Sequence, residues 1–457
     1  MSSTYQPILT PNQHQTFGIQ EMVLNPIANF DDQGLGKTKQ CYDTIAKYFE
    51  DGNIDLSIIV AKASLRENLF AEIKNDADQL SVQIISGNRQ ERLNSYRYLS
   101  HHVIVISYET LISDIGPLSE LCKVNRVLLA FDESHYLKNI KARRTKAALQ
   151  LSDLCTKTLI FSGTPIPNGV EDIYPQLRLL GFKVGNTVEE FKKRFKDIED
   201  LKIFLDDKFI RRKKESLTAL NIPKKNIHIH KVKLTKKESK IYQEIKRGTL
   251  ESFNSKEELN LNNVLTKMLR LHQFASNPEL INEDSTFEGA KIKKLDQLLE
   301  SFLSKGKKVI VWTSYRHNIF NISSKYSQYN PTTLVGGLSQ EERKNNAFAF
   351  QNSEECRLLL ATPACAREGF TLTSSHIAIY LDRSFSYLDW AQSQDRIHRI
   401  SQKKQCHIIC LEAVNTIDEK IDEILDLKGD LQSYLLGDSF KPPKKSITYE
   451  DLKKLLS

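Results

Sequence analysis

Short apolar runs alternate with amphipathic stretches along most of the 457-residue chain. Apolar runs of strand length, separated by stretches with helical periodicity, are typical of βαβ units and a parallel sheet. Ligands of such sheets bind at the loops that follow the strands. We expect strands at Ser57–Ala61, Gln83–Ser86, Val103–Ser107, Val127–Asp132 and Thr158–Ser162 in the first half, and at Lys308–Thr313, Arg357–Thr362, Ile377–Asp382 and Cys406–Glu412 in the second.

The pattern changes between about Asn186 and Ser285, where the sequence is lysine-rich, helical and poor in β-branched runs. We interpret this region as helical protrusions from two lobes, joined by a linker near Asn221–Lys225. The expected organisation is a first lobe at 1–220 with its protrusion at 186–220, a linker and second protrusion at 221–285, a second lobe at 286–437, and a tail with a short brace helix at 438–457.

Length and composition support this division. A single hydrophobic core stops growing at ~250–300 residues, so a chain of this length is expected to form at least two domains. Apolar residues make up 40% and charged residues 27%, which is ordinary for a globular protein. The net charge of +8 suits a polyanion partner, but it equally suits a basic enzyme without one.

The seven cysteines form no CxxC pair, so neither a disulfide framework nor a zinc site is expected. No signal-peptide pattern and no apolar run of ~18 residues is present, so a reduced compartment, cytoplasmic or nuclear, is expected without membrane association.

The strongest local motif is Asp31–Thr38, DDQGLGKT, which precedes a helical pattern. A glycine loop at a helix N-terminus presents backbone N–H groups to an anion. Lys37 is expected to contact the β- and γ-phosphates of a nucleotide, and the Thr38 hydroxyl to bind Mg²⁺. Asp31 replaces the first glycine of the general pattern, and a glycine turn without nucleotide is the alternative.

A second motif, DESH, follows the apolar run that ends at Phe131. In a phosphoryl-transfer site Asp132 would hold Mg²⁺ and Glu133 would orient and deprotonate the attacking water. An acidic pair at a strand end is usually a solvated turn, but its position after a P-loop favours the catalytic interpretation.

A third motif is Gln392–Gln402, QSQDRIHRISQ, in which Arg396 and Arg399 stand three residues apart, on one face of a helix. Paired guanidinium groups can stabilise charge on a γ-phosphate during transfer. The alternative is a basic surface helix.

Together these motifs and SGTPIPN (Ser162–Asn168) resemble superfamily 2 helicases of the Swi2/Snf2 type. Further segments resemble family motifs in the family's order: LTPNQ, IIVAKASLRENLFAEI, VISYETL, FIRRKKE, MLRLHQFASNP, VIVWTSY and LLATPACAREGFTLT. The resemblance covers almost the whole chain. It implies an α/β fold of two tandem RecA-like P-loop domains.

The resemblance also implies the cofactors, ATP and Mg²⁺, with ATP bound between the two lobes. Gln13 would read the adenine, and Thr38 and Asp132 would hold the metal. Lys37, Asp132, Glu133, Arg396 and Arg399 are the expected catalytic residues. The expected nucleotide contacts are Gln13, Asp32, Gly34, Leu35, Gly36, Lys37, Thr38, Lys39, Gly369, Arg396 and Arg399.

The implied partner is DNA in duplex, forked or branched form, gripped mainly through phosphates. Thr164 is expected to link the nucleotide state to the DNA surface. For each nucleic-acid candidate the alternative is a solvated residue or a core hydroxyl. The candidates are Ser64, Ser107, Tyr108, Thr164, Asn168, Arg211, Thr313, Ser314, Thr362, Arg383 and Phe385.

The chain departs from the family pattern at three places. Ser134 stands where DEAH-type motifs have alanine, and Phe385 stands where a tryptophan is usual before the last motif. Ala366 and Arg367 lie near a usual glycine pair, which puts close backbone approach to DNA or ribose there in doubt.

The sequence therefore favours a monomeric, DNA-dependent ATPase that translocates on duplex DNA and acts in replication, recombination or repair. A strand-separating DNA or RNA helicase is one alternative, and a nucleotide-switched binding subunit is another. Compact motors of this kind occur in bacteria and phages, so a bacterial or phage-infected cytoplasm is the expected setting.

Overall fold

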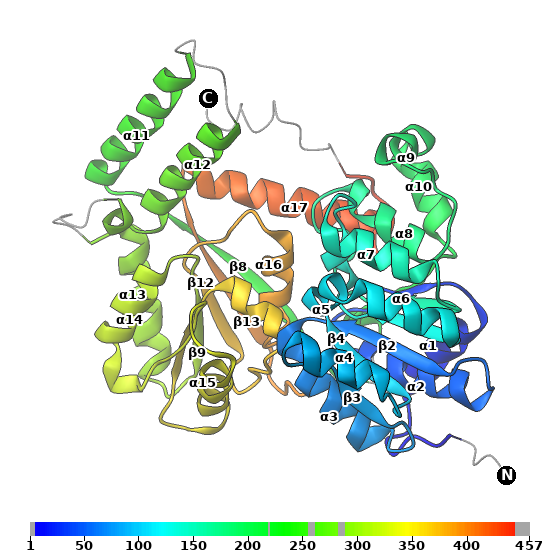
Figure 1. Cartoon of the computed structure of the whole chain (residues 1–457). Coiled ribbons are helices and arrows are strands. Elements are labelled where there is room, and N and C mark those ends of the chain that lie inside the picture. The colour runs from blue at the N-terminus through cyan, green and yellow to red at the C-terminus, as the bar shows by residue number, and fades with distance from the viewer. Residues whose placement is uncertain (1–4, 218–219, 255–260, 282–287, 444–457) are drawn as a thin grey trace. The chain divides into compact units, whose positions relative to one another are not determined.

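The computed structural model describes residues 5–217, 220–254, 261–281 and 288–443 (Figure 1). The chain divides into two compact units, of which the first contains Met1–Leu217 together with Asp430–Pro442. The second unit is formed mainly by Thr218–Gly429. The sequence analysis assigned 286–437 to the second lobe, whereas the structure places Asp430–Pro442 in the first unit. The brace helix expected in the tail falls outside the described residues.

A five-stranded parallel sheet forms the centre of the first unit. The five strands expected in the first half of the chain are confirmed, because each of the five apolar runs forms a strand of this sheet. A short parallel pair of strands, β1 and β7, adjoins it through a bridge between Asn29 and Phe161. The sheet order is β3 (Val82–Ile84), β4 (Val103–Ser107), β2 (Leu56–Ala61), β5 (Val127–Phe131) and β6 (Lys157–Ile160), and the added pair is β1 (Ala28–Asn29) and β7 (Phe209–Ile210).

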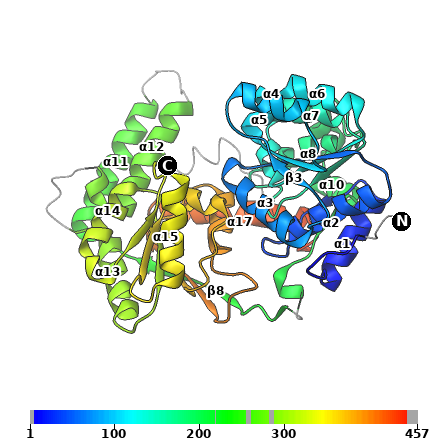
Figure 2. The ribbon, with the colours of Figure 1, turned by 60° about the horizontal axis from the view of Figure 1, so that its bottom comes forward.

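Helices cover both faces of this sheet (Figures 1 and 2). On one face the strands pack against α1 (Gln13–Leu24), α2 (Lys37–Glu50) and α3 (Arg66–Asp76). The opposite face packs against α4 (Arg89–Arg97), α5 (Tyr108–Ser113), α6 (Ile115–Val124), α7 (Arg143–Ser152), α8 (Tyr174–Leu179), α9 (Val188–Arg194) and α10 (Ile198–Leu205).

The second unit contains a six-stranded parallel sheet. All the strands expected in the second half are present in it. Strand β8 was not expected, because the sequence analysis placed its first residue in a linker and its sequence, KNIHIHKV, alternates polar and apolar residues. Its position at the sheet edge leaves much of it exposed. The order is β10 (Thr332–Leu334), β11 (Leu358–Ala361), β9 (Val309–Trp312), β12 (Ile377–Tyr380), β13 (Cys406–Ala413) and β8 (Lys225–Val232).

In the second unit one sheet face packs against α13 (Ala290–Leu303) and α14 (Arg316–Lys325). The opposite face packs against α15 (Gln340–Asn352) and the segment around Ile397. A separate apolar cluster joins α11 (Lys236–Asn254) and α12 (Leu261–Ser276) to the start of α17 (Ile417–Leu435). The fold class expected from the sequence, two α/β units with parallel sheets, is therefore confirmed. Within the described residues, no helix is both long enough and apolar enough to cross a membrane.

Candidate nucleotide site and nucleic-acid contacts

The glycine loop lies between β1 and α2, as the sequence predicted. Gly34 and Gly36 have φ values of 86° and 74°, in the left-handed region that favours glycine. Gly36 is the N-cap of α2, which begins at Lys37. The first backbone N–H groups of this helix are therefore directed toward the loop, the usual arrangement for binding a phosphate.

The Lys37 ammonium lies inside the loop. Its Nζ donates hydrogen bonds to the carbonyl oxygens of Asp31 at 2.6 Å and Asp32 at 3.0 Å. Burial lowers the pKa of Lys37, while the nearby carboxylates, Glu133 foremost, act in the opposite direction. The Lys37 ammonium and the carboxylate of Glu133, the predicted catalytic base, thus lie close enough to attract each other.

The acidic pair follows β5 directly. Burial and the neighbouring Glu133 raise the pKa of Asp132 to about 7, against the effect of Lys37. Glu133 adopts a left-handed backbone with φ 52° although it is not glycine. Such conformations are strained and are maintained only by their surroundings, and they cluster at functional sites.

Two side chains hold the Glu133 carboxylate. Gln33, from the glycine loop, donates from Nε2 to Glu133 Oε1 at 3.1 Å. His135 Nδ1 lies 3.2 Å from Glu133 Oε2 and 3.2 Å from the hydroxyl of Ser162. The glycine loop therefore contacts this carboxylate through Gln33, and the SGTPIPN motif contacts His135, which lies beside it.

Gly163 brings the SGTPIPN segment against the glycine loop. A Cβ atom at this position would lie 2.7 Å from Gln33 Cγ and 3.5 Å from Lys37 Nζ. Only glycine allows this approach, so the three motifs form one site within the first unit.

The residues of this site fit a nucleotide with its magnesium ion. A helix N-terminus and a lysine suit phosphate oxygens. Mg²⁺ is typically held by one or two protein oxygens together with phosphates and waters, and the Thr38 hydroxyl and the Asp132 carboxylate provide that donor chemistry. Among the described residues there is no group of three or more His, Cys, Asp or Glu side chains that could hold a metal.

Two of the expected nucleotide contacts, Asp32 and Lys39, form ion pairs within the fold. The Asp32 carboxylate faces Arg211 Nη2 at 2.8 Å and accepts the Lys214 N–H at 3.1 Å. Lys39 forms ion pairs with Asp76 at 2.5 Å and with Asp43 at 3.2 Å. Asp32 thus joins the loop to the segment after β7, and Lys39 joins α2 to the end of α3.

Gln13 is exposed at the start of α1, whereas Gln15 is buried against the glycine loop. Gln15 Nε2 lies 3.5 Å from the carbonyl oxygen of Leu35, and a Cβ atom on Gly36 would lie 2.2 Å from the same nitrogen. The glutamine in contact with the loop is therefore Gln15.

In the second unit, helix α16 (Tyr387–Gln394) ends before the two predicted arginine fingers. Arg396 and Arg399 lie in the turns that follow, and not on a regular helix as expected. Each Nε donates to the carbonyl oxygen four residues earlier, at 3.0 Å and 2.9 Å. Arg396 and Arg399 thus make the same side-chain hydrogen bond to the preceding turn. Gly369 has φ 81° and ends the turn of helix that follows β11.

Several nucleic-acid candidates of the first unit are buried. Ser107 is the N-cap of α5, and its hydroxyl accepts the Thr110 N–H at 3.0 Å. The Tyr108 hydroxyl donates to the Asp132 carbonyl at 2.7 Å, so this ring supports the acidic pair. Arg211 is paired with Asp32 and, at 2.9 Å, with Asp438. All three residues make contacts within the fold, and their role at nucleic acid stays a prediction.

Three candidates of the first unit remain suitable. Asn168 is exposed and Ser64 is half-buried at its position after β2. Thr164 is buried, and its hydroxyl has no hydrogen-bond partner among the residues that the structure describes.

The candidates of the second unit divide in the same way. Thr313 is fully buried and donates to Asp382 at 2.5 Å. The Arg383 guanidinium is paired with Asp422 and stacks over the Trp390 ring at 5.1 Å. Both side chains are engaged within the fold, and their role at nucleic acid stays a prediction. Ser314, Thr362 and Phe385 are half-buried at the ends of strands or in the loops that follow them.

Four site residues were not identified from the sequence: Gln15, Gln33, Gln176 and Arg212. Arg212 and Gln33 lie inside motifs that the sequence analysis recognised, yet spacing alone does not indicate which side chain turns inward. Arg212 forms a two-point ion pair with the fully buried Asp31, and Gln176 is buried beneath the DESH motif.

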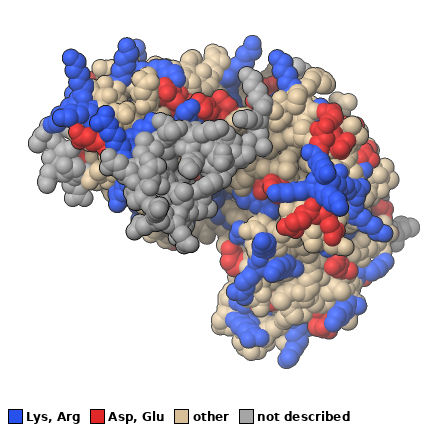
Figure 3. Space-filling model, turned by 90° about the horizontal axis from the view of Figure 1, so that it is seen from above, with Lys and Arg blue, Asp and Glu red and all other residues tan. Residues whose placement is uncertain are grey.

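Surface charge does not locate the nucleic-acid contacts further. Figure 3 shows Lys and Arg side chains at many places on the displayed face, with Asp and Glu among them. This distribution agrees with the modest net charge of +8.

The chain is similar to known proteins along most of its length. Residues 24–280 match the family described as SNF2-related domain, and residues 290–401 match the helicase conserved C-terminal domain. An uncharacterized ATP-dependent helicase of Mycoplasma genitalium is 26% identical over 93% of this chain and 41% of the relative. The ISWI chromatin-remodeling complex ATPase ISW1 of Saccharomyces cerevisiae is 24% identical over 93% of this chain and 40% of the relative.

Among solved structures, the chain is similar to the Sulfolobus solfataricus SWI2/SNF2 ATPase core in complex with dsDNA. The identity is 22%, the TM-score is 0.46, and the alignment covers 99% of this chain and 98% of that chain. The chain spans about two fifths of the length of the curated relatives named above.

Proposed function

The chain belongs to the SNF2-related family of ATP-hydrolysing motors, and on that premise we propose that it moves along duplex DNA and remodels forks, branched DNA or protein–DNA complexes in replication, recombination or repair. The observation that supports this proposal is that the glycine loop, the DESH motif and the SGTPIPN motif contact one another around Glu133, through Gln33, His135 and Gly163. The first two motifs carry the residue types of phosphoryl transfer, and the third leads to the exposed Asn168.

The residues of the proposed ATP site in the first unit each have a chemical role. Lys37 and the first N–H groups of α2 bind phosphate oxygens. Thr38 and Asp132 hold Mg²⁺, which when bound neutralises charge that develops on the phosphates. Glu133 accepts a proton from the attacking water, in an orientation set by Gln33 and His135.

Two further assignments complete the proposed ATP site. Gln15 takes the adenine-reading role expected for Gln13, because Gln15 is the glutamine in contact with the loop. Arg396 and Arg399, from the second unit, provide the positive charge that phosphoryl transfer requires.

The proposal is tested by steady-state ATPase measurements with ssDNA, dsDNA, forked DNA, four-way DNA and RNA as cofactors. We expect duplex and branched DNA to stimulate turnover most, and EDTA to abolish it. Stimulation by RNA alone would contradict the proposal, and equal stimulation by ssDNA and dsDNA would point to a strand-separating helicase. Binding to DNA should weaken steeply with salt, because phosphate contacts release counterions.

A further inference from the structure

A buried hydrogen bond joins the DESH motif to helix α8. Ser134 directly follows the predicted catalytic Glu133, and its hydroxyl donates to Gln176 Oε1 at 2.7 Å. Neither residue has any exposed surface. Alanine, which DEAH-type motifs carry at the serine position, has no donor for this bond. The serine that replaces this alanine therefore has a hydrogen-bond partner inside the fold, Gln176.

The other end of the Gln176 side chain holds the SGTPIPN segment. Gln176 Nε2 donates to the carbonyl oxygen of Pro165 at 2.8 Å and to that of Asp172 at 2.9 Å. Because a carboxamide nitrogen has two N–H groups, both are engaged, and the oxygen must face Ser134. Gln176 thus links the residue next to Glu133 with the middle of the third motif.

From Asp172 the connection continues to the surface. The Asp172 carboxylate accepts the backbone N–H of Asn168 at 2.6 Å and that of Gly169 at 3.4 Å. Asn168 is exposed, and it is the proposed nucleic-acid contact at the end of this segment. A series of hydrogen bonds therefore runs from the neighbour of Glu133 to a backbone position at the surface.

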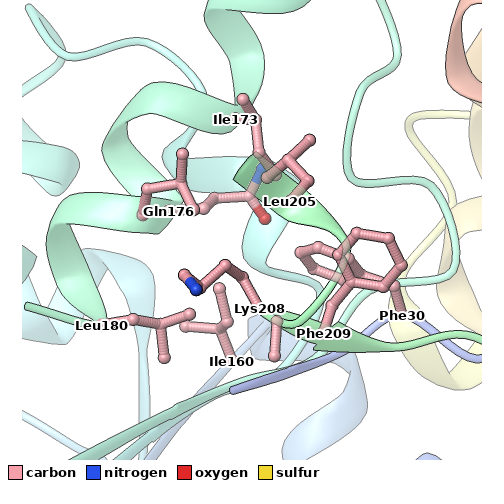
Figure 4. Close-up of a pocket in the computed structure, with 10 residues that line it drawn as sticks. Phe30, Ile160, Ile173, Gln176, Leu180, Leu205, Lys208 and Phe209 are labelled. Atoms are coloured by element: carbon pink, nitrogen blue, oxygen red, sulfur yellow. The ribbon is translucent and has the colours of Figure 1, made fainter. Parts of the chain in front are cut away.

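The Gln176 side chain has polar partners on one side and an apolar pocket on the other. It lines a small pocket whose other walls are mostly apolar, among them Ile173, Leu180 and Leu205 (Figure 4). A buried amide in such a place costs free energy unless it is hydrogen-bonded, and leucine has a similar volume. Gln176 therefore contributes to this position through its hydrogen bonds to Ser134, Pro165 and Asp172.

We propose that Gln176 is a positioning residue that acts through Ser134 to couple the Glu133 segment to the Ser162–Asn168 segment. Contact of Asn168 with nucleic acid then changes the rate of ATP turnover through this pair. The inference rests on the proposed function, because it assumes that nucleic acid stimulates hydrolysis. It adds two residues to which the family motifs assign no role.

The test compares S134A, Q176L and the double variant with the wild-type chain. The ATPase rate is measured at saturating ATP with and without duplex DNA, and the ratio of the two rates is the readout. We expect each single variant to lower this ratio about 3- to 30-fold, the range typical of mutations along coupling networks. The double variant should lose no more than the more affected single variant, because both side chains act through one bond.

Ser119→Ala is the matched control. Ser119 is also a buried serine of the first unit, and its hydroxyl donates to a carbonyl of its own helix at 2.8 Å. This variant loses the same atoms, and its ratio should equal that of the wild-type chain. Urea denaturation of every variant separates a loss of coupling from a loss of folded protein. S134A introduces the residue usual in DEAH-type motifs and is expected to fold.

Each outcome has one interpretation. If no nucleic acid stimulates the wild-type chain, the proposed function fails, and the inference fails with it. If the wild-type chain is stimulated and both single variants keep the full ratio, the pair only fills the core and the inference alone is overturned. Additive losses in the double variant would show that the two residues act separately, which also overturns it.

Discussion

Arg212 holds Asp31 by two contacts, with Nε 2.9 Å from Oδ1 and Nη2 2.5 Å from Oδ2. Asp31 begins the glycine loop and is fully buried, while Arg212 follows the short strand β7 at the end of the first lobe. A bidentate guanidinium–carboxylate pair has a fixed geometry. The base of the glycine loop is therefore fixed by a residue far away in the sequence.

Replacing Arg212 with alanine should destabilise the first unit. The change leaves the Asp31 carboxylate buried without its partner, which typically costs about 3–5 kcal/mol. The free energy of unfolding, measured by urea denaturation, should fall by that order. Arg126→Ala is the control, because Arg126 pairs with Asp55 at the surface and should matter little. Equal losses in the two variants would contradict this explanation.

Glu133→Gln should abolish turnover without abolishing nucleotide binding. General-base catalysis contributes roughly 10²- to 10⁴-fold to a rate, so kcat should fall within that range. The amide keeps the shape of the side chain, so the Kd for ATP, measured with a fluorescent analogue, should stay close to that of the wild-type chain. Unchanged turnover would remove Glu133 from the catalytic assignment.

Gln15 and Gln13 form a matched pair for testing adenine recognition. Gln15 contacts the glycine loop, whereas Gln13 is exposed one turn or less away on the same helix. Loss of one neutral hydrogen bond should raise the KM for ATP about 2- to 10-fold in Gln15→Ala, and the preference for ATP over GTP should shrink. Gln13→Ala should leave both quantities unaltered, and the reverse result would return the role to Gln13.

Asp438→Ala should loosen the C-terminal segment of the first unit. Asp438 faces Arg211 at 2.9 Å, and without it Arg211 would keep its contacts with Asp32 and the Phe30 carbonyl. Hydrogen bonds between charged groups contribute about 1.5–3 kcal/mol, so amide hydrogen exchange in Asp430–Pro442 should accelerate roughly 10- to 100-fold. Asp430→Ala removes an exposed carboxylate of the same segment and should not change the exchange rate.

Asp422 should make the second unit less stable as the pH rises toward neutrality. Burial and the hydrogen bond with Glu412 raise the pKa of Asp422 to about 7, and Arg383 offsets this only in part. A carboxyl with a raised folded pKa binds its proton more tightly in the folded state, so its stabilisation is lost between about pH 4 and the folded pKa. The free energy of unfolding should therefore fall over that range in the wild-type chain and stay flatter in Asp422→Asn.

Asp114→Asn should show the opposite pH dependence of the free energy of unfolding, because the pKa of Asp114 is lowered and that of Asp422 is raised. Burial acts to raise the pKa of Asp114, but hydrogen bonds from Arg92, Ser113 and Tyr96 outweigh it and hold that pKa below its ordinary value. The stabilisation from Asp114 is present above about pH 4 and is lost as the pH falls further. The difference in the free energy of unfolding between Asp114→Asn and the wild-type chain should consequently change only below about pH 4. Parallel pH profiles for all three proteins would contradict both assignments.

The sheets were predictable because buried parallel strands are nearly continuous apolar runs, as Leu56–Ala61 illustrates. Strand β8 escaped prediction because an edge strand need not bury both faces, and its histidines and lysines are typical of a linker. The glycine loop and the acidic pair were predictable because their chemistry is local in sequence.

Several of the candidate cations share one structural feature. Lys39, Arg211 and Arg383 carry charges suited to phosphate, but each meets a carboxylate that is remote in the sequence: Asp76, Asp438 and Asp422. A motif shows which residue types are present, whereas the fold decides which charges are already neutralised. Gln15 and Gln176 were missed for the same reason, since only packing shows that they turn inward.

Helix α17 begins in the second unit, and its last turn, with the chain as far as Pro442, belongs to the first. Leu435 and Leu436 are part of the first unit's core. A ribosome must therefore make the whole of Thr218–Gly429 before these leucines emerge. At roughly 5–20 residues per second this delay lasts on the order of 10–40 s, during which the nascent ATP-binding unit exposes the apolar surface they later cover. The core of the first unit is therefore complete only after Thr218–Gly429 of the second unit has been synthesised.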